Sequence, residues 1–229
     1  MDNHTWKDKG DILTQKKLLD YGESKDSIHQ NIKKIDIIST DYPYLLRHIR
    51  DPPKILYALG NIKLLNEPSI AIVGTRKPSQ KGKEYAKIIA EFYSKKGFVI
   101  VSGLAQGIDT LAIKTTLNNG GKVICVIPSL RNITPKKNVE LANDILKDNG
   151  LLISESLDER IKKYQFVKRN RIISGLSFCV VVVESNIRGG TMHTVEYAKK
   201  QRRLIIVADL DAIGNESLKK EGFPVFRIH

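Results

Sequence analysis

The sequence has little cysteine, and its cysteines lie in apolar surroundings. Only two occur among 229 residues, Cys125 in the run VICVI and Cys179 in the run FCVVVV. Two thiols in apolar runs are typical of core residues in a reducing compartment rather than of a disulfide framework. The five histidines are scattered without ligand spacing, which argues against a zinc site. We therefore predict neither a metal nor a cofactor.

Long apolar segments are also missing. No apolar run approaches the ~18 residues that a membrane span needs. The first residues, MDNHTWKDKGD, are polar and hold none of the apolar core of a secretory signal. We predict a cytoplasmic protein that does not associate with membranes.

Acidic residues are scarce relative to basic ones. Asp and Glu number 25 against 38 Lys and Arg, which gives a formal net charge of +13. This excess favours a polyanionic partner, most often nucleic acid, while a merely basic protein is the alternative. The chain is 41% hydrophobic, which excludes intrinsic disorder, and its length suits one main domain with a small extension.

From Ser69 onward, short apolar runs alternate with segments of helical spacing. Such strands, apolar on both faces, indicate a mostly parallel sheet covered on both sides. We predict a doubly wound α/β domain over about residues 69–228, whose ligand lies outside the carboxyl ends of the strands. The predicted strands are 56–60, 70–73, 98–101, 123–127, 151–153, 179–183 and 204–207, and the predicted helices lie within 44–49, 79–96, 108–117, 139–146, 172–176 and 191–201.

The first candidate turn, residues 74–79, directly follows the strand at 70–73. Gly74 allows a ligand to approach the backbone, and the planar fork of Arg76, between Thr75 and Lys77, fits a phosphate. Ser79 is placed to cap the next helix, whose positive end favours an anion. The glycine pattern of a dinucleotide site and the Lys-Ser/Thr of a P-loop are both missing, so an ordinary turn with a surface arginine is the alternative.

The second candidate turn, SGLAQGID at 102–109, also follows a strand. Ser102, Gly103 and Gly107 make a backbone cradle for an anion plausible. Asp109 either bonds a ribose or base, or holds the turn through backbone amides, and the structural role is favoured.

The third candidate is the basic segment 160–171, RIKKYQFVKRNR. Its basic residues interleave with Tyr164 and Phe166, which are the ingredients for holding a single strand by phosphates and bases. A solvated basic face is the alternative, and Phe166 taken alone is expected to pack in the core. The basic residues are Arg160, Lys162, Lys163, Lys168, Arg169 and Arg171.

The fourth candidate turn follows the strand at 179–183 and opens a helix. Gly189 and Gly190 at a helix start suit an anion, and either Thr191 or Thr194 adds a hydroxyl donor. Glu196, about one and a half turns further, is expected to be an exposed carboxylate paired with Lys199 or Lys200.

Together these motifs resemble the DNA-processing protein A family, also called DprA or Smf. The resemblance covers about residues 42–207, and its motifs follow the family's order. They are Tyr42-Pro43, Asp51-Pro52-Pro53, IAIVGTR at 70–76, SGLAQGID at 102–109, ISES at 153–156, FVKRNRIISGLS at 166–177 and VVVES at 181–185.

The resemblance implies an extended Rossmann-like domain that binds single-stranded DNA in a basic pocket. Such proteins protect incoming DNA in natural transformation, load a RecA-type recombinase, work as homodimers and are not enzymes. The family's DNA contacts correspond to Arg76, the SGLA turn, and the segment Arg169-Asn170-Arg171. We expect further phosphate contacts from Lys77, Lys136, Lys137 and Lys168. Backbone amides at Gly74, Gly103 and Gly190 are expected to add uncharged donors.

The chain departs from the family pattern in three places. Ala112-Ile113 replaces Ala-His, the segment 189–192 replaces Ser-Gly-Ser-Leu, and Ala208-Asp209 replaces Pro-Gly. These changes bear on dimerisation and recombinase loading more than on DNA binding. We divide the chain into an N-terminal extension, 1–41, and a Rossmann-like domain, 42–229, without a C-terminal winged-helix domain.

A second resemblance competes with the first. GGTMHTVE at 189–196 is similar to the motif of the lysine-decarboxylase-like phosphoribohydrolases, which cleave nucleoside monophosphates at the glycosidic bond. Glu196 would then be the catalytic carboxylate, helped by an arginine such as Arg171. Met192 and Arg188 stand where that motif has glycine and proline. A nucleotide-sensing domain without catalysis is a third possibility.

Overall fold

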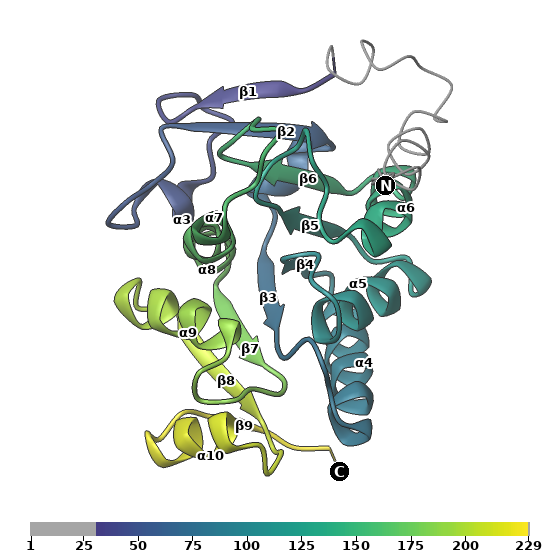
Figure 1. Cartoon of the computed structure of the whole chain (residues 1–229), viewed down its shortest axis with the longest axis vertical. Coiled ribbons are helices and arrows are strands. Elements are labelled where there is room, and N and C mark those ends of the chain that lie inside the picture. The colour runs from purple at the N-terminus through teal and green to yellow at the C-terminus, as the bar shows by residue number, and fades with distance from the viewer. Residues whose placement is uncertain (1–30, 229) are drawn as a thin grey trace, which may run out of the picture.

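Nine strands form one sheet in the computed structural model, which describes residues 31–228 (Figure 1). The first two pairings across the sheet, β1 with β2 and β2 with β6, are antiparallel, and all the others are parallel. The sheet is thus mostly parallel, as predicted. The strands, in order across the sheet, are β1 (Lys33–Asp36), β2 (Ile55–Gly60), β6 (Leu151–Ser154), β5 (Val123–Val126), β4 (Val99–Ser102), β3 (Ser69–Val73), β7 (Cys179–Val182), β8 (Leu204–Ala208) and β9 (Val225–Phe226).

Helices cover both faces of this sheet (Figure 1). One face packs against α4 (Gln80–Lys95), α5 (Ile108–Asn118) and α6 (Val139–Lys147). The other packs against α3 (Tyr44–Arg47), α8 (Asn170–Leu176), α9 (Gly190–Lys200) and α10 (Ile213–Lys220). Three short helices complete the described part: η1 (Ile62–Asn66), η2 (Lys136–Asn138) and α7 (Lys163–Lys168).

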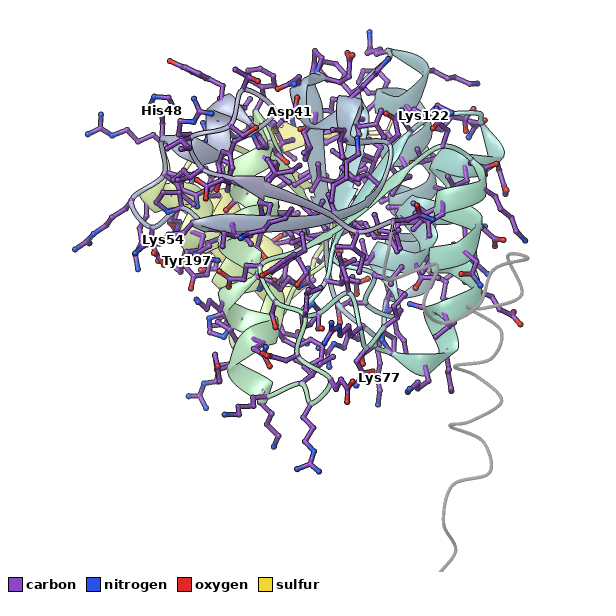
Figure 2. The ribbon with its side chains drawn as sticks, turned by 90° about the horizontal axis from the view of Figure 1, so that it is seen from above. Asp41, His48, Lys54, Lys77, Lys122 and Tyr197 are labelled. Atoms are coloured by element: carbon purple, nitrogen blue, oxygen red, sulfur yellow. The ribbon has the colours of Figure 1, made fainter. Side chains whose placement is uncertain are left out.

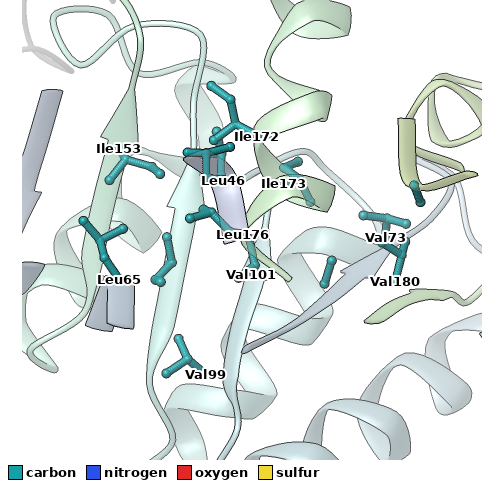
Figure 3. Close-up of a cluster of buried hydrophobic side chains, with 14 of the residues drawn as sticks. Leu46, Leu65, Val73, Val99, Val101, Ile153, Ile172, Ile173, Leu176 and Val180 are labelled. Atoms are coloured by element: carbon teal, nitrogen blue, oxygen red, sulfur yellow. The ribbon is translucent and has the colours of Figure 1, made fainter. Parts of the chain in front are cut away.

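The strand sequences explain this layering. Successive side chains of a strand point to opposite faces, so a strand between two helix layers must be apolar throughout. In β3, Ile70 and Ile72 pack with the α4–α5 layer, whereas Ala71 and Val73 pack with the α8–α9 layer. Figure 3 shows the buried apolar side chains on the α8–α9 side of the sheet, to which α3 contributes Leu46. Cys125 and Cys179 are buried free thiols, as predicted.

The strand order changes direction at β3. The chain passes from β3 through β4 and β5 to β6 on one side, then crosses to the other side of β3 and continues through β7 to β9. The carboxyl ends of β3, β4 and β7 therefore meet at a switch point, where ligands of open α/β sheets bind. The predicted doubly wound fold is confirmed, and its switch point brings three of the candidate turns together.

Several elements were not predicted from the sequence. They are β1, η1, η2, α7, α10 and β9, of which β1 and β9 lie at the two edges of the sheet. Because β1 pairs with β2, the sheet includes residues that the sequence analysis assigned to the N-terminal extension. The polar segment 1–11 lies outside the described residues. Within residues 31–228, no helix combines the length and apolar character needed to cross a membrane.

Candidate nucleic-acid interface

A cavity of about 510 Å³ opens at the switch point. It is lined by the turn after β3, the turn after β4, helices α7 and α8, and the first turn of α9. Of the residues singled out in the sequence, the structure gathers here Gly74, Thr75, Arg76, Lys77, Arg169, Asn170, Gly189, Gly190 and Thr191. Three motifs far apart in the sequence thus form one site.

The turn after β4 is held from several sides. Its backbone N–H groups at Gly103 and Ala105 donate to the Asp109 carboxylate at 3.1 and 3.3 Å, so the structural role predicted for Asp109 is confirmed. Leu104 has a φ of 59°, a left-handed conformation that non-glycine residues rarely adopt. Such a conformation persists only where the surroundings fix it, and here the Asn138 amide donates to the Leu104 carbonyl at 2.8 Å.

Ser102, Gly103 and Gly107 support this turn from behind rather than lining the cavity. The Ser102 hydroxyl donates to the Ile72 carbonyl at 2.9 Å, tying β4 to β3. Gly107 has a φ of 81°, and a side chain there would run into the Thr75 carbonyl. These contacts fix the turns after β3 and β4 against each other.

Arg169 lies beneath the same turn and is buried, with 7% of its surface exposed. Its Nη2 donates to the Gly103 carbonyl at 3.0 Å, and a side chain at position 103 would collide with its guanidinium. Burial lowers the pKa of Arg169, and the neighbouring Asp109 carboxylate opposes that shift. Burial likewise raises the pKa of Asp109, and Arg169 opposes the rise. The pair forms the floor of the cavity.

Arg171 is engaged within the protein. Its Nη2 and Nη1 donate to the two Glu155 carboxylate oxygens at 2.6 and 3.2 Å, and its Nε donates to the Asp51 carbonyl at 3.0 Å. The side chain is 5% exposed. The structure therefore places Arg171 as a clamp between α8, the end of β6 and the Asp51-Pro52-Pro53 loop, and away from the cavity lining. Its predicted contact with DNA stays a prediction.

The exposed cations of the cavity come from the turn after β3. Arg76 and Lys77 are both exposed and line its rim. In the view of Figure 2, Lys77 lies on the side of the molecule opposite to Asp41 and Lys122. These two side chains are free of the burial that constrains Arg169 and Arg171, so they are placed to meet an anion from solvent.

The two helix N-termini nearest the cavity differ. At α4, Ser79 caps the helix as predicted, since its Oγ accepts from the Gly82 N–H at 3.0 Å. The Glu184 carboxylate accepts from the Ser79 N–H at 2.9 Å, so this positive end already holds an anion. At α9, Gly190 and Thr191 line the cavity instead, and the first N–H groups of a helix have no intrahelical partner. The α9 terminus is the one placed to receive a ligand.

Three predicted lysines lie outside this cavity lining. Lys136 and Lys137 belong to η2, which Asn138 fastens beside the turn after β4. Lys168 faces a neighbouring cavity and lies 3.3 Å from a Glu155 carboxylate oxygen. They continue the basic surface around the site rather than forming its interior.

Two other expectations have clear outcomes. Phe166 was expected in the core, but it is half-buried and lines the cavity, because α7 borders the cavity on one side. Glu196 is exposed and lies 3.4 Å from Lys199, as expected for a helix-surface carboxylate. It is not part of the cavity lining.

Asn138 and Glu184 were missed as supporting residues. Asn138 reaches a carbonyl 34 positions away and Glu184 an amide 105 positions away, so no local pattern could identify either contact. For Glu184, the signals were its place directly after an apolar strand and within the motif VVVES at 181–185.

Comparisons with known proteins agree with this geometry. The family model described as DNA recombination-mediator protein A matches residues 33–222. The DNA processing protein DprA of Bacillus subtilis is 39% identical over 176 residues, which is 76% of this chain and 59% of that protein. The DprA of Streptococcus pneumoniae is 40% identical over 176 residues, which is 76% of this chain and 62% of that protein. The chain thus spans about three fifths of these relatives.

Solved structures point the same way. The X-ray structure of Streptococcus pneumoniae DprA matches with a TM-score of 0.79 at 34% identity, covering 88% of this chain and 73% of that one. DNA processing protein A of Helicobacter pylori, whose structure is described in terms of a single-stranded DNA binding mode, matches with a TM-score of 0.76 at 31% identity, covering 85% of this chain and 90% of that one. A molybdenum cofactor binding protein from Rippkaea orientalis, at 20% identity, shares the fold alone.

The family match extends over most of the chain and includes the three segments that meet at the switch point. The chain belongs to the DNA recombination-mediator protein A family, whose members include proteins named DprA and Smf.

Proposed function

We propose that this chain binds single-stranded DNA at the switch-point cavity and serves as a recombination mediator of the DprA/Smf type. In this role it protects incoming DNA during natural transformation and passes it to a RecA-type recombinase, as a homodimer. The family description and the single-strand binding mode reported for the Helicobacter pylori relative support the proposal.

One observation carries the DNA-binding part. The exposed Arg76 and Lys77, the open N-terminus of α9 and the ring of Phe166 line one cavity. Phosphates pair with cations and helix N–H groups, and bases stack on aromatic rings without regard to sequence. The phosphate and the base of a nucleotide thus each have a chemically matching surface here.

We propose binding rather than catalysis. The phosphoribohydrolase alternative needs a carboxylate at the substrate, but Glu196 pairs with Lys199 outside the cavity lining. The carboxylate that does line it, Asp109, accepts from two backbone amides and faces Arg169. Incubation with nucleoside monophosphates is expected to release no ribose 5-phosphate, and release that Glu196→Gln abolishes would overturn this part of the proposal.

The direct test is a binding titration with fluorescent oligo-dT of about 35 nucleotides, long enough to fill a single-strand site, beside a duplex of equal length. If Arg76, Lys77, Lys136, Lys137 and Lys168 neutralise about five phosphates, the logarithm of affinity falls with the logarithm of salt at a slope near −3.5. A slope near zero, or equal affinity for duplex, would contradict the proposal. Arg76→Ala is the test variant for the rim of the cavity. Its matched control is Arg202→Ala, which replaces an exposed arginine just ahead of β8.

Partner and assembly have separate tests. Light scattering on the purified chain checks the homodimer, and a strand-exchange assay with a RecA-type recombinase checks loading. A monomer at all concentrations would remove the homodimer from the proposal. A recombinase whose assembly on coated single strands does not change would remove loading, without bearing on DNA binding.

A further inference from the structure

A second cavity of about 500 Å³ lies beside the first. It opens where β5 and β6 end, between the segment that holds Arg131, the loop 155–158, and α7. Because β3 to β6 are parallel, the two cavities lie along the same edge of the sheet. At ~4.8 Å per strand, they are separated by roughly 10–15 Å.

Helix α7 stands between the two cavities and gives each an aromatic side chain. Tyr164 and Lys168, four residues apart and so on the same side of the helix, line the second cavity. Phe166 and Val167 line the first. Tyr164 is 59% exposed, as an unstacked ring available to a ligand would be.

Arg169 connects the two cavities from below. It lines both of them and is more than nine-tenths buried. Its Nε and Nη1 have no hydrogen-bond partner among the described residues. Both nitrogens are shielded from solvent, so Arg169 gives this wall a buried positive charge rather than a direct hydrogen bond to a ligand.

The acidic residues of the second cavity are occupied by the protein itself. Glu155 is paired in a bidentate contact with Arg171 and lies 3.3 Å from Lys168. Asp158 accepts from the Gln165 amide at 3.0 Å. The exposed Arg131 therefore gives the opening a cation that faces solvent.

We propose that the second cavity binds nucleotide units, with a base on Tyr164 and its phosphate at Arg131, and that these units belong to the strand whose other part fills the first cavity. The inference rests on the proposed function, because the strand must first bind at the switch point. A single strand then crosses α7, with the Phe166 ring on one side of the helix and the Tyr164 ring on the other.

The experiment measures affinity for oligo-dT over about 4 to 16 nucleotides, the span of known single-strand site sizes. The wild-type chain is compared with Tyr164→Ala and Arg131→Ala, and Tyr44→Ala and Arg202→Ala are the controls. Tyr44 and Arg202 are exposed residues of the same types outside the lining of both cavities. Titration of the wild-type chain with dTMP alone tests whether the site also takes a free nucleotide.

The wild-type chain is expected to gain affinity with length up to the span of both cavities. Tyr164→Ala should lose at least about fivefold for the long oligonucleotides, the lower end of base-stacking losses, with the shortest ones unaffected. Arg131→Ala should reduce the steepness of the salt dependence by about 0.7 for long strands only.

Other outcomes separate the inference from the proposed function. If the wild-type chain binds and both variants match it at every length, the second site is refuted while the proposed function stands. If the wild-type chain binds no oligonucleotide and no dTMP, the proposed function and the second site are both refuted. Binding of dTMP that needs Tyr164, without binding of strands, would support a free-nucleotide site and refute the proposed function.

Discussion

The turn after β3 and the segment Arg169-Asn170-Arg171 carry the same kind of side chain to the same end of the sheet, yet they use it differently. Arg76 is exposed at the rim of the cavity. Arg169 and Arg171 are buried, the first under Gly103 and the second against Glu155. Both segments are basic in the sequence, and only one of them presents its charge to solvent.

This difference shows what decides the role of an arginine. An exposed guanidinium keeps its hydration and exchanges it for a phosphate at little cost. A buried one has lost its hydration and depends on the acceptors around it, so its removal is felt in the fold first. Substitutions at the two segments should therefore separate stability from binding.

The largest effect is expected at Arg171. Arg171→Leu leaves the largely buried Glu155 carboxylate without its bidentate partner, which should lower the free energy of unfolding by about 3 kcal/mol. For a chain of this size the melting temperature would fall by roughly 6–12 °C. Thermal unfolding of this variant beside Arg202→Ala measures it. An unchanged melting temperature would refute the clamp, and the double variant Arg171→Leu/Glu155→Gln should recover part of the loss.

The next effect contrasts two glycines at the site. Gly103→Ala places a methyl group against the Arg169 guanidinium and should cost about 1–3 kcal/mol, as overpacking does. Gly190→Ala meets nothing within 4 Å and should be neutral or slightly stabilising, by about 0.4–1 kcal/mol. Urea unfolding of both variants makes the comparison. Equal destabilisation at the two positions would show that Arg169 does not pack against the turn as described.

A smaller effect is expected at the capped helix. Ser79→Ala removes the oxygen that accepts from the Gly82 N–H and should lower stability by about 1 kcal/mol. Ser79→Asp, which keeps a capping oxygen, brings a second carboxylate beside Glu184 and should not recover the full amount. Urea unfolding provides the measurement. Full stability in Ser79→Ala would mean that Glu184 alone holds the end of α4.

The smallest effect concerns reactivity rather than stability. Burial raises the pKa of Cys179 to about 12, and the thiolate is the reactive form. At pH 8 the folded chain should therefore take up iodoacetamide at Cys179 far more slowly than the urea-unfolded chain, with the rate rising only toward the raised pKa. Mass spectrometry of the labelled peptide provides the readout, and rapid labelling under native conditions would contradict the burial of this strand.

The periodic elements were predictable because their signals are local. The strand at 70–73 is apolar throughout, and the helix from Ser79 shows one apolar face and a capping residue, so β3 and α4 were found almost to the residue. At the end of the chain, α10 and β9 gave no comparable signal. β9 is two residues long, and α10 buries only Gly214, Asn215 and Leu218.

The location of the site could be predicted from the sequence, but the role of each arginine in it could not. Parallel strands bring their following turns to one edge, which is why Arg76, Asn170 and Gly190 could be expected together. Whether an arginine is buried depends on partners from distant segments, such as Glu155 and Asp51 for Arg171. Glu155 lies 16 positions and Asp51 lies 120 positions from Arg171, each in a different element, so no helical or strand periodicity indicates either pairing.

The most direct test compares the salt dependence of oligo-dT binding in Arg76→Ala and Arg171→Leu with that of the wild-type chain. We expect Arg76→Ala to reduce the steepness of the slope by about 0.7 at an unchanged melting temperature, because one phosphate contact is lost. We expect Arg171→Leu to lower the melting temperature and leave the slope of the folded protein as it was, because its guanidinium pairs with Glu155 inside the protein. The opposite result, in which Arg76→Ala keeps the wild-type slope while Arg171→Leu reduces it without loss of stability, would contradict these roles.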